Sequence, residues 1–397
     1  MSGVVLGLQG TVDYEVVWDS AILERIVEEL GITESELDPL IPVDSERNLV
    51  IVLLALLRDG GGGERFVASS TIVETFARRF EMQITLGGTC VRAALGMREL
   101  GVSSMLHLVS TDENVRRLLP EDISYISSAT RDTLDPHLIL QYSAGTSVRI
   151  GDVIITAPHP NRVIFANDPP ARKLLISDQL QEALTTASLF LVSGFNSIQE
   201  EDILVDRLAR VAEAIEHAPE QMLVMFEDAG YHRPDFAPRV RTSMSGVVDV
   251  YSMNEDELQA HLDRDVDLLD LDDVARAMSD LERLIPGPIL VVHTKYWAAA
   301  FGEGARRFSA ALRGGITMAS TRYLHGDRLD AARYADTGTA TRNPHGEPLA
   351  AALQSQGGDR VAVEVGLILE TATPTTIGLG DTFVGGFLTA LAKEGNA

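Results

Sequence analysis

The chain has 397 residues, 45% of them hydrophobic and 23% charged, and its 58 acidic and 33 basic side chains give a net charge of −25. That balance argues against a nucleic acid or an anionic membrane surface as a partner, because both require a basic protein surface. The three lysines, Lys173, Lys295 and Lys393, do not follow a glycine, which excludes a Walker A phosphate loop ending in Gly-Lys-Ser/Thr.

Length and cysteine content narrow the class of protein further. A chain of this length predicts roughly two domains, or one large domain with an insertion. The single cysteine, Cys90, cannot form an internal disulfide. The N-terminus has no signal-peptide pattern, and the longest apolar run, 49–57, is far shorter than the roughly 20 residues of a membrane-spanning helix. We expect a cytoplasmic protein.

The first third of the chain alternates predicted strands and helices. Its elements, read from apolar periodicity and glycine breaks, are a buried strand over 4–8, a glycine-marked turn over 9–13, helices over 23–30 and 49–57, a glycine break at 60–63, a turn at 87–89, a helix ending at Gly101 and a strand over 102–109.

The middle of the chain interrupts this alternation. A meander without helices is predicted between 136 and 169, with short strands over 137–142, 147–150, 153–156 and 162–165. Strands and helices then alternate again, with strands over 189–192, 222–226, 246–252 and 289–293. This order predicts a parallel sheet flanked by helices. The meander is then an insertion at an edge or over a face of that sheet.

Two later stretches are less regular. Residues 323–359, rich in Arg, Asp, Ala, Thr and Gly, are expected to include a long loop. The acidic run 263–273 has aliphatic residues threaded through it and is predicted as the solvated face of a helix.

The strongest functional signal lies at 376–388. Gly378 and Gly380 allow a sharp turn that aims backbone N–H groups at one point, an anion hole. An aspartate beside those donors, Asp381, is placed to accept a proton from a substrate hydroxyl. Alternatively, Asp381 caps the helix that follows. The apolar face of that helix is formed by Phe383, Val384, Phe387, Leu388 and Leu391.

The string Gly378-Leu-Gly-Asp-Thr-Phe-Val-Gly-Gly-Phe387 resembles the C-terminal signature of ribokinase-like sugar kinases. Within that superfamily the chain looks most like the ADP-dependent glucokinase and phosphofructokinase family. The family's Asn-x-Asp, Gly-Gly-Asn/Gln, Asn-Arg-Phe-Ile and Asn-x-x-Glu segments are similar, in the same order, to Gly10–Asp13, Gly87–Thr89, Pro160–Ile164 and Ser252–Leu258.

The resemblance implies an α/β fold with two parts. The first is a ribokinase-like three-layer domain with a mainly parallel central sheet, over 1–18, 70–135 and 167–397. The second is a smaller, discontinuous, β-rich lid domain over 19–69 and 136–166.

The resemblance also implies a substrate site. Asp13 would hydrogen-bond sugar hydroxyls, although it also suits an Asx-turn. Gly87, Gly88 and Thr89 would approach the sugar, or form a plain strand-to-helix turn. Glu64 matches a sugar-contacting glutamate of the lid, or is simply an exposed charge.

Further positions are implied for phosphate and metal. Arg162 would reach the transferred phosphate from the lid, or be a surface arginine. Asn254 and Glu257 form a capping box by spacing, and in the family this glutamate helps position Mg²⁺. Glu227 matches the glutamate of a family His-x-Glu motif, but Met225 replaces the histidine.

The predicted function is that of a Mg²⁺-dependent sugar kinase, which transfers a phosphoryl group from ADP to a hydroxyl of a hexose or hexose phosphate. Asp381 would act as the base, with the amides of Gly378, Leu379 and Gly380 stabilising the transferring group. The alternatives are an ATP-dependent ribokinase-like carbohydrate kinase and a non-catalytic sugar- or nucleotide-binding protein. The ADP donor is implied by the resemblance alone.

Three points stay open at this stage. A sugar phosphate would need a basic cluster, for which Arg92, Arg149 and Arg162 are candidates. His293, at a strand end, is expected to be satisfied by neighbouring groups rather than to bind a ligand. A monomer and a homodimer are both compatible with the resemblance.

Overall fold

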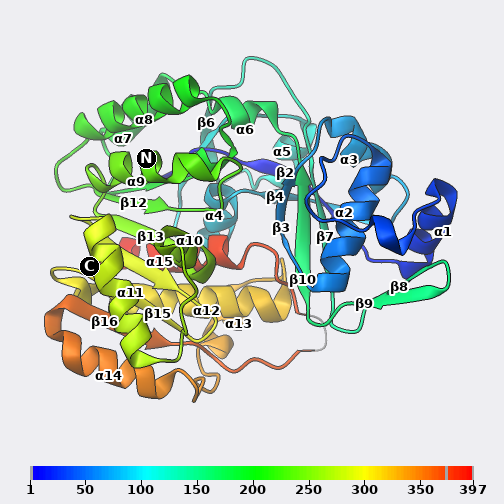
Figure 1. Ribbon diagram of the computed structural model, residues 1–397. Helices are drawn as coiled ribbons and strands as arrows, with labels where there is room; N and C mark the ends of the chain where they lie inside the picture. Colours follow the sequence, from blue (N-terminus) through cyan, green and yellow to red (C-terminus); the bar gives the residue numbers. More distant parts are fainter. Residues whose placement is uncertain (1–2, 372–373, 396–397) are drawn as a thin grey trace.

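A nine-stranded sheet forms the centre of the large part of the molecule, which we describe from a computed structural model covering residues 3–371 and 374–395 (Figure 1). Every neighbouring pair from β6 to β14 is parallel, and β15 alone runs antiparallel to its neighbours. The expected mainly parallel α/β sheet is thereby confirmed. In spatial order its strands are β16 (Val361–Val365), β15 (Trp297–Phe301), β14 (Ile289–His293), β13 (Val250–Asn254), β12 (Leu223–Glu227), β11 (Leu189–Val192), β1 (Val4–Leu6), β5 (Met105–Leu108) and β6 (Ser124–Ser127).

Helices cover both faces of this sheet, so its strands are apolar on both sides. Val250 of β13 packs into the core of one face, and the next residue, Tyr251, packs into the core of the other. The first face carries α4 (Thr89–Glu99), α12 (Ser309–His325) and α15 (Leu379–Glu394). The second carries α7 (Gln179–Leu184), α8 (Glu201–Glu216), α9 (Ala237–Ser245), α10 (Glu255–Leu262), α11 (Leu271–Leu284) and α14 (Glu347–Gly357).

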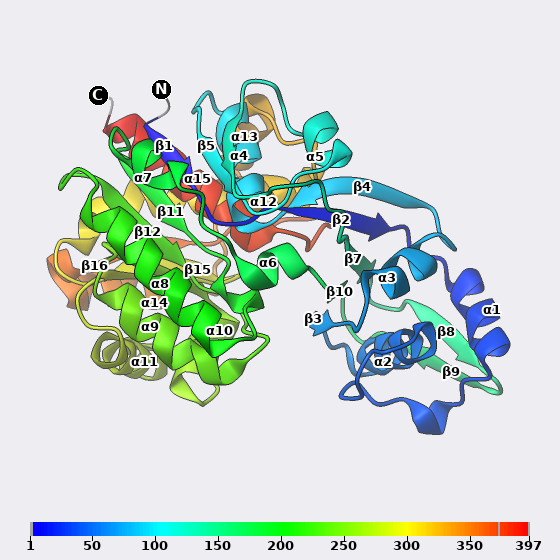
Figure 2. The same ribbon diagram turned by 90° about the horizontal axis from the view of Figure 1, so that it is seen from above.

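A second sheet of five strands stands beside the large one (Figure 2). Its order is β3 (Gly63–Phe66), β10 (Asn161–Ala166), β7 (His137–Tyr142), β2 (Thr11–Val16) and β4 (Met82–Gly87). The meander therefore does not lie at an edge or over a face of the large sheet, because β7 pairs with β2 and β10 pairs with β3. This small sheet combines strands from both ranges expected for the lid with β2 and β4 from outside them.

The helices of the small sheet lie on the side away from the large sheet (Figure 2). Helix α2 is buried from Leu49 to Leu57, capped by Ser45 and ended by Gly60 at φ 69°, as its apolar run predicts. Its companions are α1 (Ser20–Leu30) and α3 (Ser70–Ala77), and a hairpin of β8 (Ser147–Ile150) and β9 (Val153–Thr156) packs beside them.

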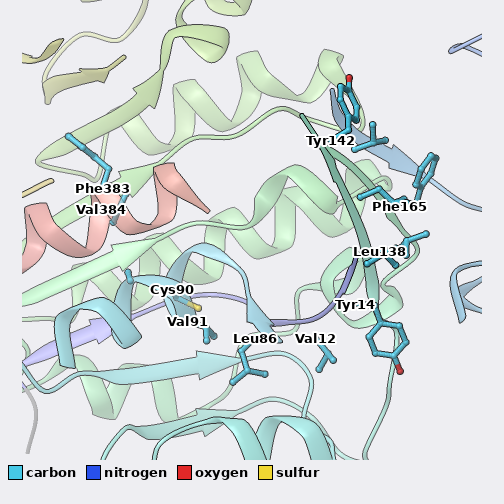
Figure 3. Packing of buried hydrophobic residues seen from close by; sticks show 14 of the residues in the cluster. Val12, Tyr14, Leu86, Cys90, Val91, Leu138, Tyr142, Phe165, Phe383 and Val384 are labelled. Atoms are coloured by element: carbon cyan, nitrogen blue, oxygen red, sulfur yellow. The ribbon is translucent and has the colours of Figure 1, made fainter. Parts of the chain in front are cut away.

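One continuous apolar core joins the two sheets. It runs from Phe383 on α15 through Cys90 and Val91 on α4 to Val12 and Leu138 of the small sheet (Figure 3). Alternation along the strands turns the opposite face of the small sheet, here called the cleft face, toward the large part of the molecule, which it contacts through Glu64 and His232. That face carries Asp13, Glu64, His137 and Gln141.

Two expectations about irregular segments are wrong. Residues 323–359 contain α13 (Ala331–Thr337) and α14 in place of a long loop, with the Asp330 side chain capping α13. The acidic run 263–273 is largely a connection, because Asp263 ends α10 in the left-handed conformation and Asp270 caps α11. Aspartates favour caps and turns over helix interiors, which explains the second difference.

Two short helices complete the described elements, α5 (Glu113–Leu118) and α6 (Pro169–Lys173). No helix among the described residues has the length and apolar character needed to cross a membrane.

Candidate active site

The start of α15 lies at the carboxyl edge of the large sheet, where open α/β sheets bind ligands. Gly378 has φ 66°, and a Cβ there would meet Arg92 Cδ at 2.5 Å, so only glycine fits. The first N–H groups of a helix have no acceptor within it. The amides of Leu379 and Gly380 belong to this first turn of α15, directly after Gly378, so they are open to an acceptor from outside the helix.

Asp381 stands in the first turn of α15 beside these amides. Its Oδ1 accepts a hydrogen bond of 2.9 Å from Thr89 Oγ1, and its Oδ2 lies 3.8 Å from Arg92 Nε. Its side chain retains 26% exposure. Among the described residues these are the partners of the carboxylate, which does not cap its own helix. Thr89 and Asp381, 292 positions apart, thus meet in one site.

Arg92 connects this aspartate to the cleft face of the small sheet. Its Nη2 donates to Asp13 Oδ2 at 2.7 Å and to Glu15 Oε1 at 3.1 Å. Burial alone would lower the pKa of Arg92, but Asp13, Glu15 and Asp381 together raise it above its ordinary value. Thr11 Oγ1 donates to the other oxygen of Asp13 at 2.7 Å. The guanidinium of Arg92 is therefore charged, and the carboxylates of Asp13 and Glu15 share the hydrogen bonds of its Nη2.

The Gly87-Gly88 pair makes room for this arrangement. A Cβ on Gly87 would stand 2.1 Å from Asp13 Oδ2, and Gly88 has φ 84° with Gln9 O 2.9 Å from its Cβ position. Both glycines are thus needed to pack β4 and α4 against Asp13 and the turn after β1.

Glu64 and His137 extend the site along the small sheet. Glu64 Oε1 accepts a 2.8 Å hydrogen bond from His232 Nε2, in the loop after β12. Burial alone would raise the pKa of Glu64, but the hydrogen bond and charge of His232 outweigh it and lower the pKa. His137 Nε2 lies 3.4 Å from Asp168 Oδ2. Burial would lower the pKa of His137, yet the Asp168 carboxylate raises it to about 9.

Several buried polar atoms in this region have no hydrogen-bond partner among the described residues. They are Gln9 Oε1, His137 Nε2, Asn167 Oδ1 and His232 Nδ1. Buried polar groups in proteins are nearly always paired, so an unpaired group of donors and acceptors suits a ligand rich in hydroxyls. Sequence reasoning missed His137, Asn167 and His232 as site residues, because none of them belongs to a motif.

Glu227 ends β12, and Glu257 lies in the first turn of α10, the helix that follows the adjacent strand β13. Glu227 Oε1 contacts His293 Nε2 at 3.0 Å, while Oε2 is buried without a partner among the described residues. The His293 ring stacks on Phe383 at 4.4 Å between centroids. Thus His293 is satisfied by its neighbours, as expected for a strand-end histidine. The histidine that contacts Glu227 thus lies on β14. On β12, the position two residues before Glu227, where a His-x-Glu motif would have its histidine, is Met225.

Asn254 and Glu257 form the capping box that their spacing predicts. Asn254 Oδ1 accepts from the amides of Asp256 and Glu257 at 2.7 and 3.1 Å, and the Asn254 amide donates to Glu257 Oε2 at 2.7 Å. Burial, then the charges of Asp228 and Glu227, raise the pKa of Glu257 well above its ordinary value. No group of three His, Cys, Asp or Glu side chains suited to direct metal binding occurs among the described residues.

The three arginines considered for a sugar phosphate do not converge. Arg92 is committed to carboxylates, and Arg149 lies exposed on the outlying β8–β9 hairpin. Arg162 is half-buried on β10, two residues before Ile164, which pairs with Glu64. It forms no ion pair with the residues that the structure describes.

A family model and several solved structures match the chain. The family model described as the ADP-specific phosphofructokinase/glucokinase conserved region matches residues 2–284. No curated protein matches the chain.

Solved structures of similar fold cover almost the whole chain. A phosphofructokinase from Pyrococcus horikoshii OT3 with AMP has a TM-score of 0.79 at 17% identity, covering 99% of this chain and 98% of its own. An ADP-dependent kinase in complex with fructose-6-phosphate and ADPβS has a TM-score of 0.76 at 14% identity, covering 98% and 93%. An Anopheles gambiae adenosine kinase has a TM-score of 0.50 at 15% identity, covering 99% and 94%.

Proposed function

Because the chain belongs to the ADP-specific phosphofructokinase/glucokinase family of sugar phosphotransferases, we propose that it transfers the β-phosphoryl group of ADP to a hydroxyl of an unphosphorylated hexose. The observation that carries this proposal is the connection Asp13–Arg92–Asp381, which joins the expected sugar residue to the expected base beside the anion hole.

The proposed chemistry uses groups at the start of α15. Asp381 accepts the proton of the attacking hydroxyl, whose oxygen forms a bond to the β-phosphorus while the bond to the bridging oxygen breaks and AMP leaves. The amides of Gly378, Leu379 and Gly380 hydrogen-bond the oxygens of the transferring group. Thr89 donates to Asp381 and fixes the orientation of its carboxylate.

Glu227 and Glu257 fit a hydrated Mg²⁺ better than a directly coordinated one. Each supplies carboxylate oxygens, the ligand type that Mg²⁺ prefers, and Glu227 Oε2 is buried without a partner among the described residues. Burial first, and then the charges of Asp228 and Glu227, raise the pKa of Glu257, so a nearby cation would favour its ionised form. When bound, Mg²⁺ would neutralise phosphate charge. Asn254, occupied by its cap, would serve this site by orienting Glu257.

The acceptor is inferred from charge. Asp13, Glu64 and Asp168 supply carboxylate oxygens that accept hydrogen bonds from hydroxyls, and Arg92 offers no free charge to a second phosphate. A hexose phosphate, which the neighbouring complex with fructose-6-phosphate suggests as the competing acceptor, would bring its phosphate among these carboxylates. A neutral hexose avoids that repulsion.

The small sheet is proposed as part of a lid. Segments 19–69 and 136–166 would close on the bound sugar and exclude water, which competes as a phosphoryl acceptor. Arg162 would reach the transferring phosphate from this side.

A donor and acceptor panel tests the proposal. AMP or ADP formation is measured with ADP or ATP as donor, against glucose, other hexoses and fructose 6-phosphate. We expect kcat/KM to be highest for ADP with an unphosphorylated hexose. A preference for fructose 6-phosphate would overturn the acceptor assignment, and a preference for ATP would overturn the donor assignment. If no pair is turned over, the chain is a binding protein.

A further inference from the structure

A side chain of the small sheet holds the segment that leads into the anion hole. Gln141, on β7, donates from Nε2 to Pro374 O at 3.0 Å. Its Oε1 accepts from Thr376 N at 2.7 Å and from Thr376 Oγ1 at 3.1 Å. Both ends of one side-chain amide are thus used in three hydrogen bonds to two residues, Pro374 and Thr376, more than 230 positions away.

The same segment is held from its other side by the large part of the molecule. Arg322 Nε donates to Ile377 O at 2.6 Å, and Thr375 N donates to Tyr323 O at 3.2 Å, both on α12. Gly378 follows at once with its positive φ, and the amides of α15 begin there. Residues 374–377 are therefore held between α12 and β7. Because α15 begins directly after this segment, the positions of α12 and β7 determine how its first amides are oriented.

The chemistry of the side chain suits this position. Gln141 is directly opposite Arg162 in the pairing of β7 with β10, on the cleft face of the small sheet. A glutamine offers a donor and an acceptor without charge. A carboxylate at this position would accept from Thr376 but leave Pro374 O without its donor, and it would place a negative charge near the anion site.

We propose that Gln141 is a positioning residue for phosphoryl transfer, one that keeps the anion-hole amides aligned when the small sheet stands in this position. Because the hydrogen bonds come from a different sheet than the one that carries the site, the alignment depends on how the two parts of the molecule are docked. The inference rests on the proposed function for its effect on catalysis, but the hydrogen-bonded contact itself does not.

The test compares Gln141→Met with a matched control. Gln83 on β4 pairs with Glu15 on the same face of the same sheet, and its side chain makes no hydrogen bond with the described residues. Methionine has nearly the volume of glutamine and cannot hydrogen-bond the segment. Two quantities are measured: steady-state kinetics with ADP and the preferred hexose, and hydrogen exchange of a peptide spanning 374–380 in the absence of nucleotide.

We expect Gln141→Met to lower kcat by roughly 10-fold, with KM for the hexose within about twofold of the unchanged chain, as for an interaction that matters in the transition state. Exchange of the 374–380 peptide should become faster, and Gln83→Met should change neither quantity. Unchanged exchange, unchanged kcat, or equal effects in the two variants would overturn the inference. Since the exchange is measured without nucleotide or sugar, a chain that phosphorylates no sugar refutes the proposed function separately from the contact.

Discussion

Arg92 is the residue on which the geometry of the site depends most. It is 5% exposed, and its guanidinium neutralises Asp13 and Glu15 while standing near Asp381. Without it, these neighbouring carboxylates would repel one another. The sequence marks this arginine only as one of several basic residues, since its partners lie about 80 and 290 positions away and no local pattern joins them.

Replacing Arg92 with methionine should therefore affect both stability and activity. Removing one partner of a buried ion pair costs about 3–5 kcal/mol, whereas the matched change Arg98→Met, on the exposed face of α4, should cost at most about 1 kcal/mol. Urea unfolding measures the difference. If Arg92→Met does not fold, Arg92→Lys, which keeps the charge but loses the planar fork, should still lower kcat/KM by more than tenfold. Equal costs for the variants at 92 and 98 would contradict this account.

His137 predicts how stability depends on pH. Its pKa is raised from 6.5 to about 9 by Asp168, so its stabilising contribution is complete below pH 6.5 and is lost as pH rises through 9. His137→Gln should remove that loss, which amounts to a few degrees in apparent Tm. His217→Gln, an exposed histidine at the end of α8, serves as the control. Thermal unfolding at pH 6 and pH 9.5 measures the effect, and an unaltered slope in His137→Gln would refute it.

At the scale of elements, strands were more predictable than connections. The strands at 137–142, 147–150, 153–156, 189–192 and 289–293 have the bounds that their apolar residues predict. Strand pairing was not predictable, because β2 and β4 join the meander through partners distant in sequence. The acidic run 263–273 was predicted as a helix face but is largely a connection. The spacing of leucines among aspartates does not distinguish the two.

Asn254 has two roles that mutation can separate: it caps α10, and we propose that it orients Glu257 toward Mg²⁺. Asn254→Ala should lower the free energy of unfolding by about 0.5–2 kcal/mol, because the cap of α10 is lost, while Asn254→Ser keeps a capping oxygen and most of that stability. Asp270→Ala, which removes the cap of α11, is the matched control. The concentration of Mg²⁺ at half-maximal activity should rise in Asn254→Ala only. If Asn254→Ser keeps its stability but also loses Mg²⁺ response, the amide binds the metal and the cap is incidental.

At the scale of the whole molecule, contacts between the two parts bring the predicted site residues together, through Arg92 with Asp13 and Asp381 and through His232 with Glu64. The large part of the molecule supplies Asp381 and the first amides of α15. The small sheet supplies Asp13, Glu64 and Gln141. One apolar core runs through both, so the docking of the sheets is part of the fold rather than an addition to it. A net charge of −25 disfavours a polyanionic partner, whereas the amides at a helix start and Arg162 are the groups that we propose for a small anion.

The motif at 376–388 predicted the glycine turn and the helix start that follows it, because both are local properties. The buried polar side chains that we propose for the acceptor region were not predictable in the same way, since His137, Asn167 and His232 come from three separate connections and strands. Their roles follow only from the three-dimensional arrangement.

The most direct test of the central claim is the stoichiometry of phosphoryl transfer by the unchanged chain and by Asp381→Asn. With ADP, Mg²⁺ and an unphosphorylated hexose, the unchanged chain should form AMP and hexose phosphate in equal amounts. Asp381→Asn should lose roughly 10²–10⁴-fold in kcat, the usual contribution of a general base, while still binding nucleotide. Full activity in Asp381→Asn, or AMP formation that does not require the hexose, would contradict the account.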